Sequence, residues 1–255
     1  MFSFSESFGK TGRLDAEYYQ PKHYKLINFL NSGRTIGNSC NLFDKNFNPD
    51  DNTEYKYIEL ANIGMTGEIS GVESILGEAL PTRARRLVHA GDVIVSSIEG
   101  SLQSCAIITN EYDNALCSTG FYVLNSQEYN SETLFVLLKS DPIQSLLKRG
   151  CSGTILTSIS KDEFLNIPLP PISSDIQNQI KEMVSKDYML RRKSKSLLDV
   201  AKQAVEMAIE QSEEEAMTWL NKIISESQLP AAECIFRGNS TTVPKERHAV
   251  PLQTA

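Results

Sequence analysis

A proline-rich junction at Ile167–Pro171 divides the chain into two stretches with different sequence patterns. Its three prolines fix φ and remove backbone donors, so no helix can run through them. Behind the junction, residues 172–229 contain neither glycine nor proline. Ser174 followed three residues later by Gln177 is typical of a capping box, which predicts that a helix begins there. The junction therefore predicts a folded domain followed by a long helix.

The predicted helix carries its apolar side chains on one face. At helical spacing these are Ile176, Ile180, Met183, Val184, Leu190, Leu197, Leu198, Ala201, Val205 and Ala208. About 40 residues at about 1.5 Å each give a helix of about 60 Å before a break near Ser212. A single small domain cannot cover so long a stripe, so we expect it to bind a second helix. An apolar cluster from Met217 to Ile224 predicts a short final helix.

The residues before the junction alternate between strand-like and helical patterns. Pro21 suits the first turn of a helix that extends to about residue 30. Alternating apolar runs separated by glycines predict short strands over residues 35–125. Residues 131–149 predict a helix or a helix pair, which Pro142 interrupts. The predicted fold class is therefore α+β, with a mixed, largely antiparallel sheet followed by a long coiled-coil-forming helix.

Three regions follow from these patterns. They are a folded domain over residues 1–171, the long helix with its short terminal helix over 172–229, and a flexible tail over 230–255. No stretch approaches the roughly 18 apolar residues of a membrane span, and the N-terminus lacks the pattern of a secretion signal, so we expect a cytoplasmic protein. Five cysteines and three histidines are scattered without a Cys-x-x-Cys pair, so we expect no metal site.

Motifs for catalysis are absent from the sequence. There is no Gly-x-x-x-x-Gly-Lys-Ser/Thr loop, no Gly-x-Gly-x-x-Gly and no Asn-Pro-Pro-Tyr stretch. Pro49-Asp50 followed by Glu54-Tyr-Lys56 resembles a nuclease metal site, but its acids are too close in sequence to lie on separate strands. We therefore predict no catalytic residue and no cofactor.

Two basic segments are candidates for binding nucleic acid, although the net charge of −7 argues mildly against such a partner. Arg83, Arg85 and Arg86 stand in a stretch predicted to be an exposed loop that leads to a strand. Arginine forks suit phosphate oxygens and the O6/N7 edge of guanine. The alternative for these arginines is an ordinary solvated or salt-bridged surface.

The second basic segment joins cations to hydroxyl groups. Lys148 and Arg149 precede Ser152, Thr154 and Thr157, and such a loop can contact a DNA backbone. The alternative is a helix end at which the cations stabilise the dipole and Gly150 acts as the cap.

The order of several segments resembles one half of a type I restriction–modification specificity subunit. The segments are Arg13–Pro21 (Arg-Leu-Asp-Ala-Glu-Tyr-Tyr-Gln-Pro), Tyr57–Ile63, Gly91–Ser97, Ser118–Leu124, Ser152–Thr154 with Ile159-Ser160, and Ile167–Pro171 with Gln177 and Ile180. The last segment is the most specific, because it is similar to the Ile-Pro-x-Pro-Pro-Leu-x-x-Gln-x-x-Ile junction between a target-recognition domain and its spacer helix.

Members of that family usually carry two recognition domains and two spacer helices, whereas this sequence has one of each. The resemblance implies a half-subunit that forms a homodimer through antiparallel helices and reads one half of a bipartite target in double-stranded DNA. It also implies docking to a methyltransferase (modification) subunit, and to a restriction subunit where one is present. The chain itself would have no enzymatic activity.

On this interpretation, DNA is held by the two basic segments, and polar loop residues face the base edges. The predicted loop residues are Lys45, Asn46, Ser97, Ser101, Gln103, Ser152, Thr154 and Thr157. Two other functions remain open from the sequence: an adaptor that binds no DNA and recruits a helical partner, and an enzyme with unrecognised motifs.

Overall fold

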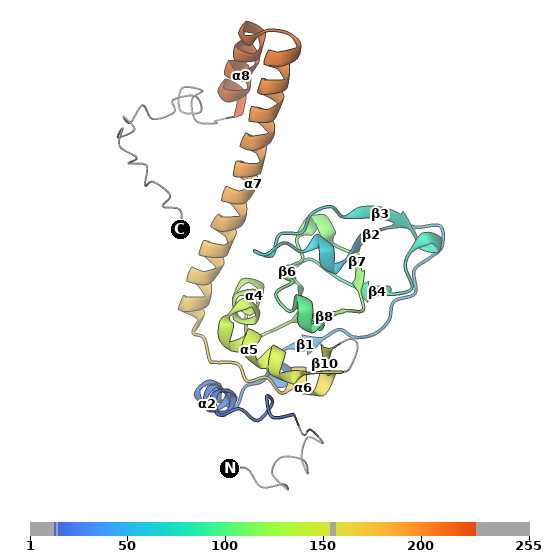
Figure 1. Ribbon diagram of the computed structural model, residues 1–255, viewed down its shortest axis with the longest axis vertical. Helices are drawn as coiled ribbons and strands as arrows, with labels where there is room; N and C mark the ends of the chain where they lie inside the picture. Colours follow the sequence, from blue (N-terminus) through green and yellow to red (C-terminus); the bar gives the residue numbers. More distant parts are fainter. Residues whose placement is uncertain (1–12, 14, 154–156, 228–255) are drawn as a thin grey trace, which may run out of the picture. The chain divides into compact units, whose positions relative to one another are not determined.

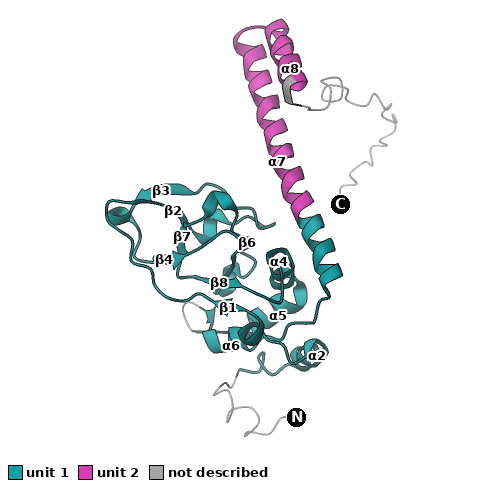
Figure 2. Cartoon of the chain, turned by 180° about the vertical axis from the view of Figure 1, so that it is seen from behind, with its two compact units in different colours: residues 1–184 teal, residues 185–255 magenta. Residues whose placement is uncertain are grey.

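A computed structural model describes residues 13, 15–153 and 157–227 of the 255-residue chain. The chain divides into two compact units, residues 1–184 and residues 185–255, which Figure 2 shows in teal and magenta. The predicted flexible tail, residues 230–255, lies outside the described residues. No helix in the described part of the chain is both long and apolar enough to cross a membrane.

The first unit is built from short helices and strands, which Figure 1 labels. Its helices are α2 (Pro21–Leu30), α3 (Ile36–Ser39), α4 (Ser131–Lys139), α5 (Asp141–Gly150) and α6 (Lys161–Leu165), with 3-10 turns η1 (Leu60–Asn62), η2 (Gly77–Ala79), η3 (Glu99–Ser101) and η4 (Asn110–Tyr112). Its strands are β1 (Asn41–Leu42), β2 (Glu54–Ile58), β3 (Glu73–Leu76), β4 (Ala84–Leu87), β5 (Val93–Ser96), β6 (Cys105–Ile107), β7 (Leu116–Ser118), β8 (Phe121–Asn125), β9 (Cys151–Ser152) and β10 (Ser158–Ile159). The predicted α+β class is confirmed, Pro21 lies in the first turn of α2 as expected, and the helical stretch over residues 131–149 is divided near Pro142, which lies in the first turn of α5.

Two four-stranded sheets form the centre of this unit. The first has the strand order β1-β8-β5-β6, and its three ladders are antiparallel. The second has the order β3-β2-β7-β4, with a parallel ladder between β2 and β7 and antiparallel ladders on either side. Strands β9 and β10 form a separate antiparallel pair. This arrangement agrees with the mixed, largely antiparallel sheet that the alternating runs predicted.

Strand β5 shows how the two-residue period of a strand creates two cores. Val93 and Val95 belong to one hydrophobic cluster, together with buried residues of α4, α5 and α6. Ile94 belongs to a second cluster, with Ile58 of β2 and Cys117 of β7. All three β5 side chains are fully buried. The first sheet therefore packs against helices on one face and against the second sheet on the other.

The proline-rich junction is paired with an earlier segment of the chain. Ile36 donates its N–H to Ile167 O at 3.0 Å, and Leu169 donates its N–H to Arg34 O at 3.1 Å. Ile167 and Leu169 are both buried in the first hydrophobic cluster. The junction is thus an integral part of the first unit, because its free backbone groups and its apolar side chains are both used there.

The capping box predicted at the start of the long helix is wrong. Helix α7 (Ser174–Glu210) begins at the expected place, but Ser173 serves its first turn. Ile176 N–H lies 3.5 Å from Ser173 Oγ, and Gln177 N–H donates to Ser173 O at 3.0 Å. The cap therefore lies one residue earlier than the sequence pattern indicated, and the Gln177 side chain is available for another role.

Gln177 joins the first turn of α7 to the start of α4. Its Oε1 accepts from Asn130 N–H at 2.9 Å, and its Nε2 donates to Glu128 O at 2.9 Å and to Ile172 O at 3.1 Å. The side-chain Nδ2 of Asn130 donates in return to the backbone carbonyl of Gln177 at 3.0 Å. Gln177 is 9% exposed, so these are mostly buried hydrogen bonds. We term the contact between Gln177 and Asn130 the glutamine clamp.

The second unit consists of the rest of α7 and of α8 (Glu213–Ser227). The two helices are separated at Gln211 and Ser212, close to the predicted break. Figure 1 shows α8 beside the last turns of α7. Ala204 of α7 and Ala216 and Leu220 of α8 are buried. The short final helix expected from the sequence is therefore present and folds back.

Candidate nucleic-acid interface

The ends of several strands meet at one edge of the first unit and are joined by backbone hydrogen bonds. Thr119, in the turn between β7 and β8, donates its N–H to Arg83 O at 2.8 Å. Gly120 O accepts from both the N–H and the hydroxyl of Ser97, at 2.9 Å each. Ser97 O accepts in turn from Ile159 N–H at 2.9 Å. We call these five linked residues the strand-end edge.

Two loops that were predicted to contact DNA lie next to each other on this edge. Glu99 donates its N–H to Thr157 O at 3.0 Å, which places the loop that begins at Ser97 beside the loop that follows β9. Ser152 is exposed and Thr157 is half-buried, whereas Thr154 lies outside the described residues. Loops from different parts of the sequence thus form one surface.

Ser101 and Gln103 differ in what their side chains can contact. Ser101 Oγ lies 2.8 Å from Ser96 Oγ, so its hydroxyl already has a partner inside the loop. The Gln103 side chain is exposed, and the backbone carbonyl of Gln103 accepts from Lys139 Nζ at 2.8 Å. The same ammonium donates to Met65 O at 2.8 Å. Lys139 therefore fixes the backbone of Gln103 while the carboxamide remains at the surface.

The three arginines were predicted on an exposed loop that leads to a strand, which holds for Arg83 but is wrong for Arg85 and Arg86. Arg83 precedes β4 and is exposed, whereas Arg85 and Arg86 lie within β4 and are half-buried. The register with β7 shifts between Ala84 and Arg86, which makes Arg85 the extra residue of a β-bulge. Bulges re-aim side chains and are common next to functional sites. The bulge also hides the alternation that would have identified the strand.

Arg86 connects β4 to the loop between β1 and β2. Its Nη1 donates to Asn46 Oδ1 at 2.6 Å, and the neighbouring Lys45 is exposed. Asp44 in the same loop forms an ion pair with Lys161 at the start of α6, which lowers the pKa of Asp44. Two predicted contact groups are thus brought together. The contact also adds Lys161, a cation that no motif in the sequence indicated.

The basic pair at the end of α5 packs against the N-terminal segment. The Arg149 guanidinium lies 3.7 Å from the centre of the Tyr18 ring, and its Nε donates to Tyr18 O at 2.9 Å. Arg13 donates to the carbonyls of the two residues that follow Arg149, at 3.2 and 2.8 Å. Burial and a hydrogen bond to Glu163 raise the pKa of Tyr18 to about 12. Lys148 is exposed.

This packing gives Arg149 a structural role beside its predicted role with DNA. Both Lys148 and Arg149 stand in the last turn of α5, where cations stabilise the negative end of the helix dipole. The segment Arg13–Pro21, which carried part of the family resemblance, is therefore used to close the end of α5.

The strand-end edge and its loops carry polar and charged groups that can form hydrogen bonds. No three His, Cys, Asp or Glu side chains among the described residues gather so as to hold a metal ion. Burial raises the pKa of the Cys117 thiol and raises that of Cys105 to about 12, which makes both poor nucleophiles. The strand-end edge and its loops supply arginine, hydroxyl and carboxamide groups, which suit phosphates and base edges.

The predicted partner face of α7 has a half-buried part and an exposed part. The half-buried residues are Ile180, Val184, Leu197, Ala201 and Ala208. The exposed ones are Ile176, Met183, Leu190, Leu198 and Val205, at 49–67% exposure. Ile209 extends this exposed face at 79%. Apolar side chains therefore remain uncovered along α7 even where α8 folds back.

Comparison with known proteins identifies the family. Residues 14–189 match the family described as type I restriction modification DNA specificity domain. Among curated proteins, none matches this sequence. A solved structure that concerns complex assembly and conformational transition of the type I R-M system is 23% identical, with a TM-score of 0.52. The HsdS subunit from Thermoanaerobacter tengcongensis is 22% identical, with a TM-score of 0.50.

Both structural matches cover 83% of this chain and 51% of the other chain, so this chain spans about half the length of those proteins. At this level of identity they show a shared fold. The family match covers well over half of the sequence. The chain therefore belongs to the family of type I restriction–modification DNA specificity domains.

Proposed function

We propose that this chain is the sequence-specificity subunit of a type I restriction–modification system and recognises one half of a bipartite target in double-stranded DNA. The observation that carries the proposal is the strand-end edge, where segments that are far apart in sequence form one polar surface. Membership of a DNA specificity family supports DNA as the ligand of this surface. In this proposal the chain binds the DNA target and positions it, while partner subunits carry out the chemistry.

Individual groups on and around this surface suit particular parts of DNA. Arg83 is an exposed member of the strand-end edge, and Arg85 stands at the bulge of the adjoining strand, so we infer that both present a guanidinium fork to guanine. The exposed carboxamide of Gln103 suits the N6/N7 edge of adenine. Lys45 and Lys148 are exposed cations that can contact phosphates, which position the protein without reading sequence.

A second copy of the chain would supply the other half-site. The chain spans about half the length of the two solved structures, and the apolar face of α7 is exposed. Two copies that pair antiparallel through this face form a two-fold symmetric homodimer. The paired helices then set the distance between half-sites, and methyltransferase (modification) and restriction subunits dock around them.

Methylome sequencing tests this function in a host that carries the gene, its deletion, or a variant. We expect one bipartite methylated motif with the wild-type chain and its complete loss on deletion. The double variant Arg83→Ala/Arg85→Ala should lose methylation of that motif, whereas Lys25→Ala, an exposed change on α2, should retain it. A methylome that deletion leaves unchanged would contradict the proposal. An adaptor without DNA-binding activity would also fail to retard any duplex when the methyltransferase subunit is added.

A further inference from the structure

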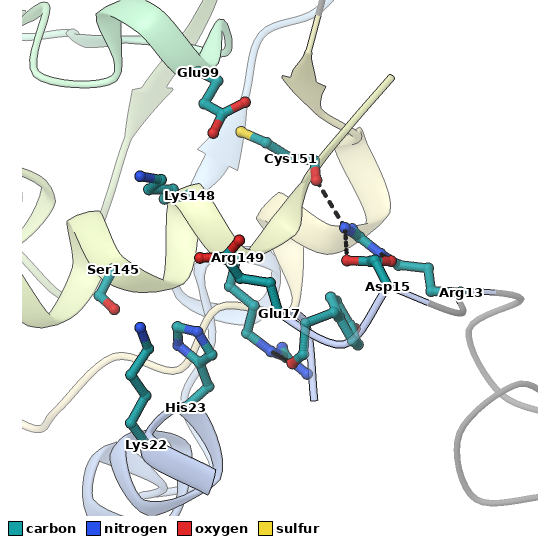
Figure 3. A pocket seen from close by; sticks show the side chains of 11 residues that line it. Arg13, Asp15, Glu17, Lys22, His23, Glu99, Ser145, Lys148, Arg149 and Cys151 are labelled. Carbon is teal, nitrogen blue, oxygen red and sulfur yellow. Dashed lines mark hydrogen bonds and ion pairs between the residues drawn. The ribbon is translucent and has the colours of Figure 1, made fainter. Parts of the chain in front are cut away.

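A pocket on the first unit lies between the N-terminal segment, α2 and the end of α5 (Figure 3). Its volume is about 160 Å³, and charged side chains dominate its lining. Arg13 and Asp15 on its rim satisfy one another: Arg13 Nε and Nη2 donate to the two Asp15 carboxylate oxygens at 2.9 and 2.8 Å. This pair contributes no net charge, so the character of the pocket depends on its other residues.

Three other cations line the pocket, and their charges are not paired within the described residues. Lys22 comes from α2, and Lys148 and Arg149 come from α5. In the described part of the chain, neither ammonium group has a hydrogen-bond partner, and Arg149 uses only its Nε, in the bond to the Tyr18 carbonyl. Two acids, Glu17 and Glu99, also line the pocket, which leaves a net charge of about +1 at neutral pH.

His23 adds a buried polar group to this lining. His23 is 4% exposed, and its Nδ1 has no hydrogen-bond partner in the described part of the chain. Burial, then the nearby Lys22 and Arg149, lower the pKa of His23, while Glu17 acts in the opposite direction. A buried ring nitrogen without a hydrogen-bond partner is unfavourable, and a bound anion would favour the protonated ring and accept a hydrogen bond from it.

We propose that this pocket binds a phosphate group, held by Lys22, Lys148 and Arg149 with help from Ser145 and His23. A tetrahedral dianion offers more acceptor positions than a carboxylate, and three cations with a hydroxyl match that number. The same cations would repel a metal ion. The phosphate comes either from a DNA backbone or from a small phosphorylated ligand. Only the DNA source rests on the proposed function.

Titration of the full chain with inorganic phosphate, followed by calorimetry, tests the site directly. We expect saturable binding by the wild-type chain and about tenfold weaker binding for Lys22→Gln and for Lys148→Gln, since each removes one charged hydrogen bond. Lys25→Gln is the matched control, because Lys25 is exposed on the same helix as Lys22 and does not line the pocket. Phosphate binding that does not saturate, or binding that Lys25→Gln weakens as much as Lys22→Gln does, would overturn the proposed site.

A pH series with sulfate tests the part played by His23. Sulfate stays dianionic across the neutral range, so only the protein titrates. A bound anion raises the pKa of His23, binding takes up a proton, and affinity should therefore rise as the pH falls from 8 to 6. His23→Gln should keep binding but lose this rise. A flat wild-type profile would remove His23 from the site.

Binding of duplex DNA by the same variants separates the two sources of phosphate. If the phosphate belongs to DNA, Lys148→Gln should weaken the binding of duplexes of every sequence alike. The slope of log affinity against log salt concentration should become shallower by about one. Unchanged DNA affinity with lost binding of inorganic phosphate would assign the pocket to a separate phosphorylated ligand. Failure of the proposed function gives a different result, in which the wild-type chain binds phosphate but retards no duplex.

Discussion

The two units of the chain differ in how each is stabilised internally. The first buries both faces of a central sheet, and strand β5 contributes to a hydrophobic cluster on each side. In the second, among residues 185–225, three residues are buried: Ala204, Ala216 and Leu220. The first unit thus contains the apolar contacts that stabilise a domain, whereas in the second most apolar side chains are only half-buried or are exposed.

This difference separates two kinds of function. In the proposed function, base recognition requires side chains that are fixed before DNA arrives, and the backbone hydrogen bonds of the strand-end edge would hold the segments that carry them. Assembly requires a surface that gains stability when a partner covers it, and the exposed face of α7 has that character. Substitutions in the two units should therefore affect different measurements.

The largest effect is expected on the exposed face of α7. In the double variant Leu190→Glu/Leu198→Glu, a homodimer would lose four buried leucine side chains, or about 6–12 kcal/mol of association free energy. Analytical ultracentrifugation should then show a monomer, while urea unfolding of the first unit stays within about 0.5 kcal/mol. Arg192→Glu, at an exposed position away from the apolar face, is the control and should remain a dimer. A double variant that still dimerises would exclude this face as the interface.

The next largest effect is expected in the core of the first unit. Phe164 is fully buried and stacks on Tyr122 with ring centres 4.3 Å apart. Phe164→Ala should lower the free energy of unfolding by about 3–5 kcal/mol in urea titrations. Phe29→Ala is the matched control, because Phe29 is 84% exposed and its loss should cost less than about 0.5 kcal/mol. Similar values for the two variants would show that the core lies elsewhere.

A smaller effect is expected at the glutamine clamp. Gln177→Ala leaves Asn130 N–H and two carbonyl groups without partners, which should cost about 1–3 kcal/mol. Amide hydrogen exchange at Asn130 should accelerate accordingly. Asn178→Ala changes the exposed neighbour and should leave that exchange rate unchanged. Slow exchange at Asn130 in both variants would mean that the clamp contributes no stability.

The smallest effect distinguishes the two possible caps of α7. Ser173→Ala should destabilise the first turn by about 0.5–1 kcal/mol, because Ser173 Oγ is the acceptor near Ile176 N–H. Ser174→Ala should change stability by no more than a few tenths of a kcal/mol. Hydrogen exchange at Ile176 measures both. The opposite order of effects would restore the capping box expected from the sequence.

Local patterns in the sequence were sufficient for the features that depend on a few neighbouring residues. The proline junction, the long helix behind it, the helix start at Pro21 and the interruption at Pro142 follow from φ restrictions and from side-chain periodicity. The family was also predictable, because the junction motif is specific and the family match confirms it. These elements required no knowledge of which segments meet in space.

The remaining features arise from contacts between distant residues. Strand β4 was missed because its bulge places Arg85 and Arg86 in succession where alternation was expected. The clamp was missed because a Ser-x-x-Gln spacing is satisfied locally in many helices, whereas here Gln177 reaches residue 130 instead. The pairing of Arg149 with Tyr18 has no periodic signature, since 131 residues separate the two.

The glutamine clamp also bears on how recognition units can be exchanged between chains. A crossover at the prolines would combine one parent's Gln177 with the other parent's Asn130, and the hydrogen bonds between them would depend on chance compatibility. A crossover after Val184, where the compact unit ends, keeps both partners in one parent. The cassette that can be inherited or engineered as a whole is therefore residues 1–184, and it includes the first turns of its own helix.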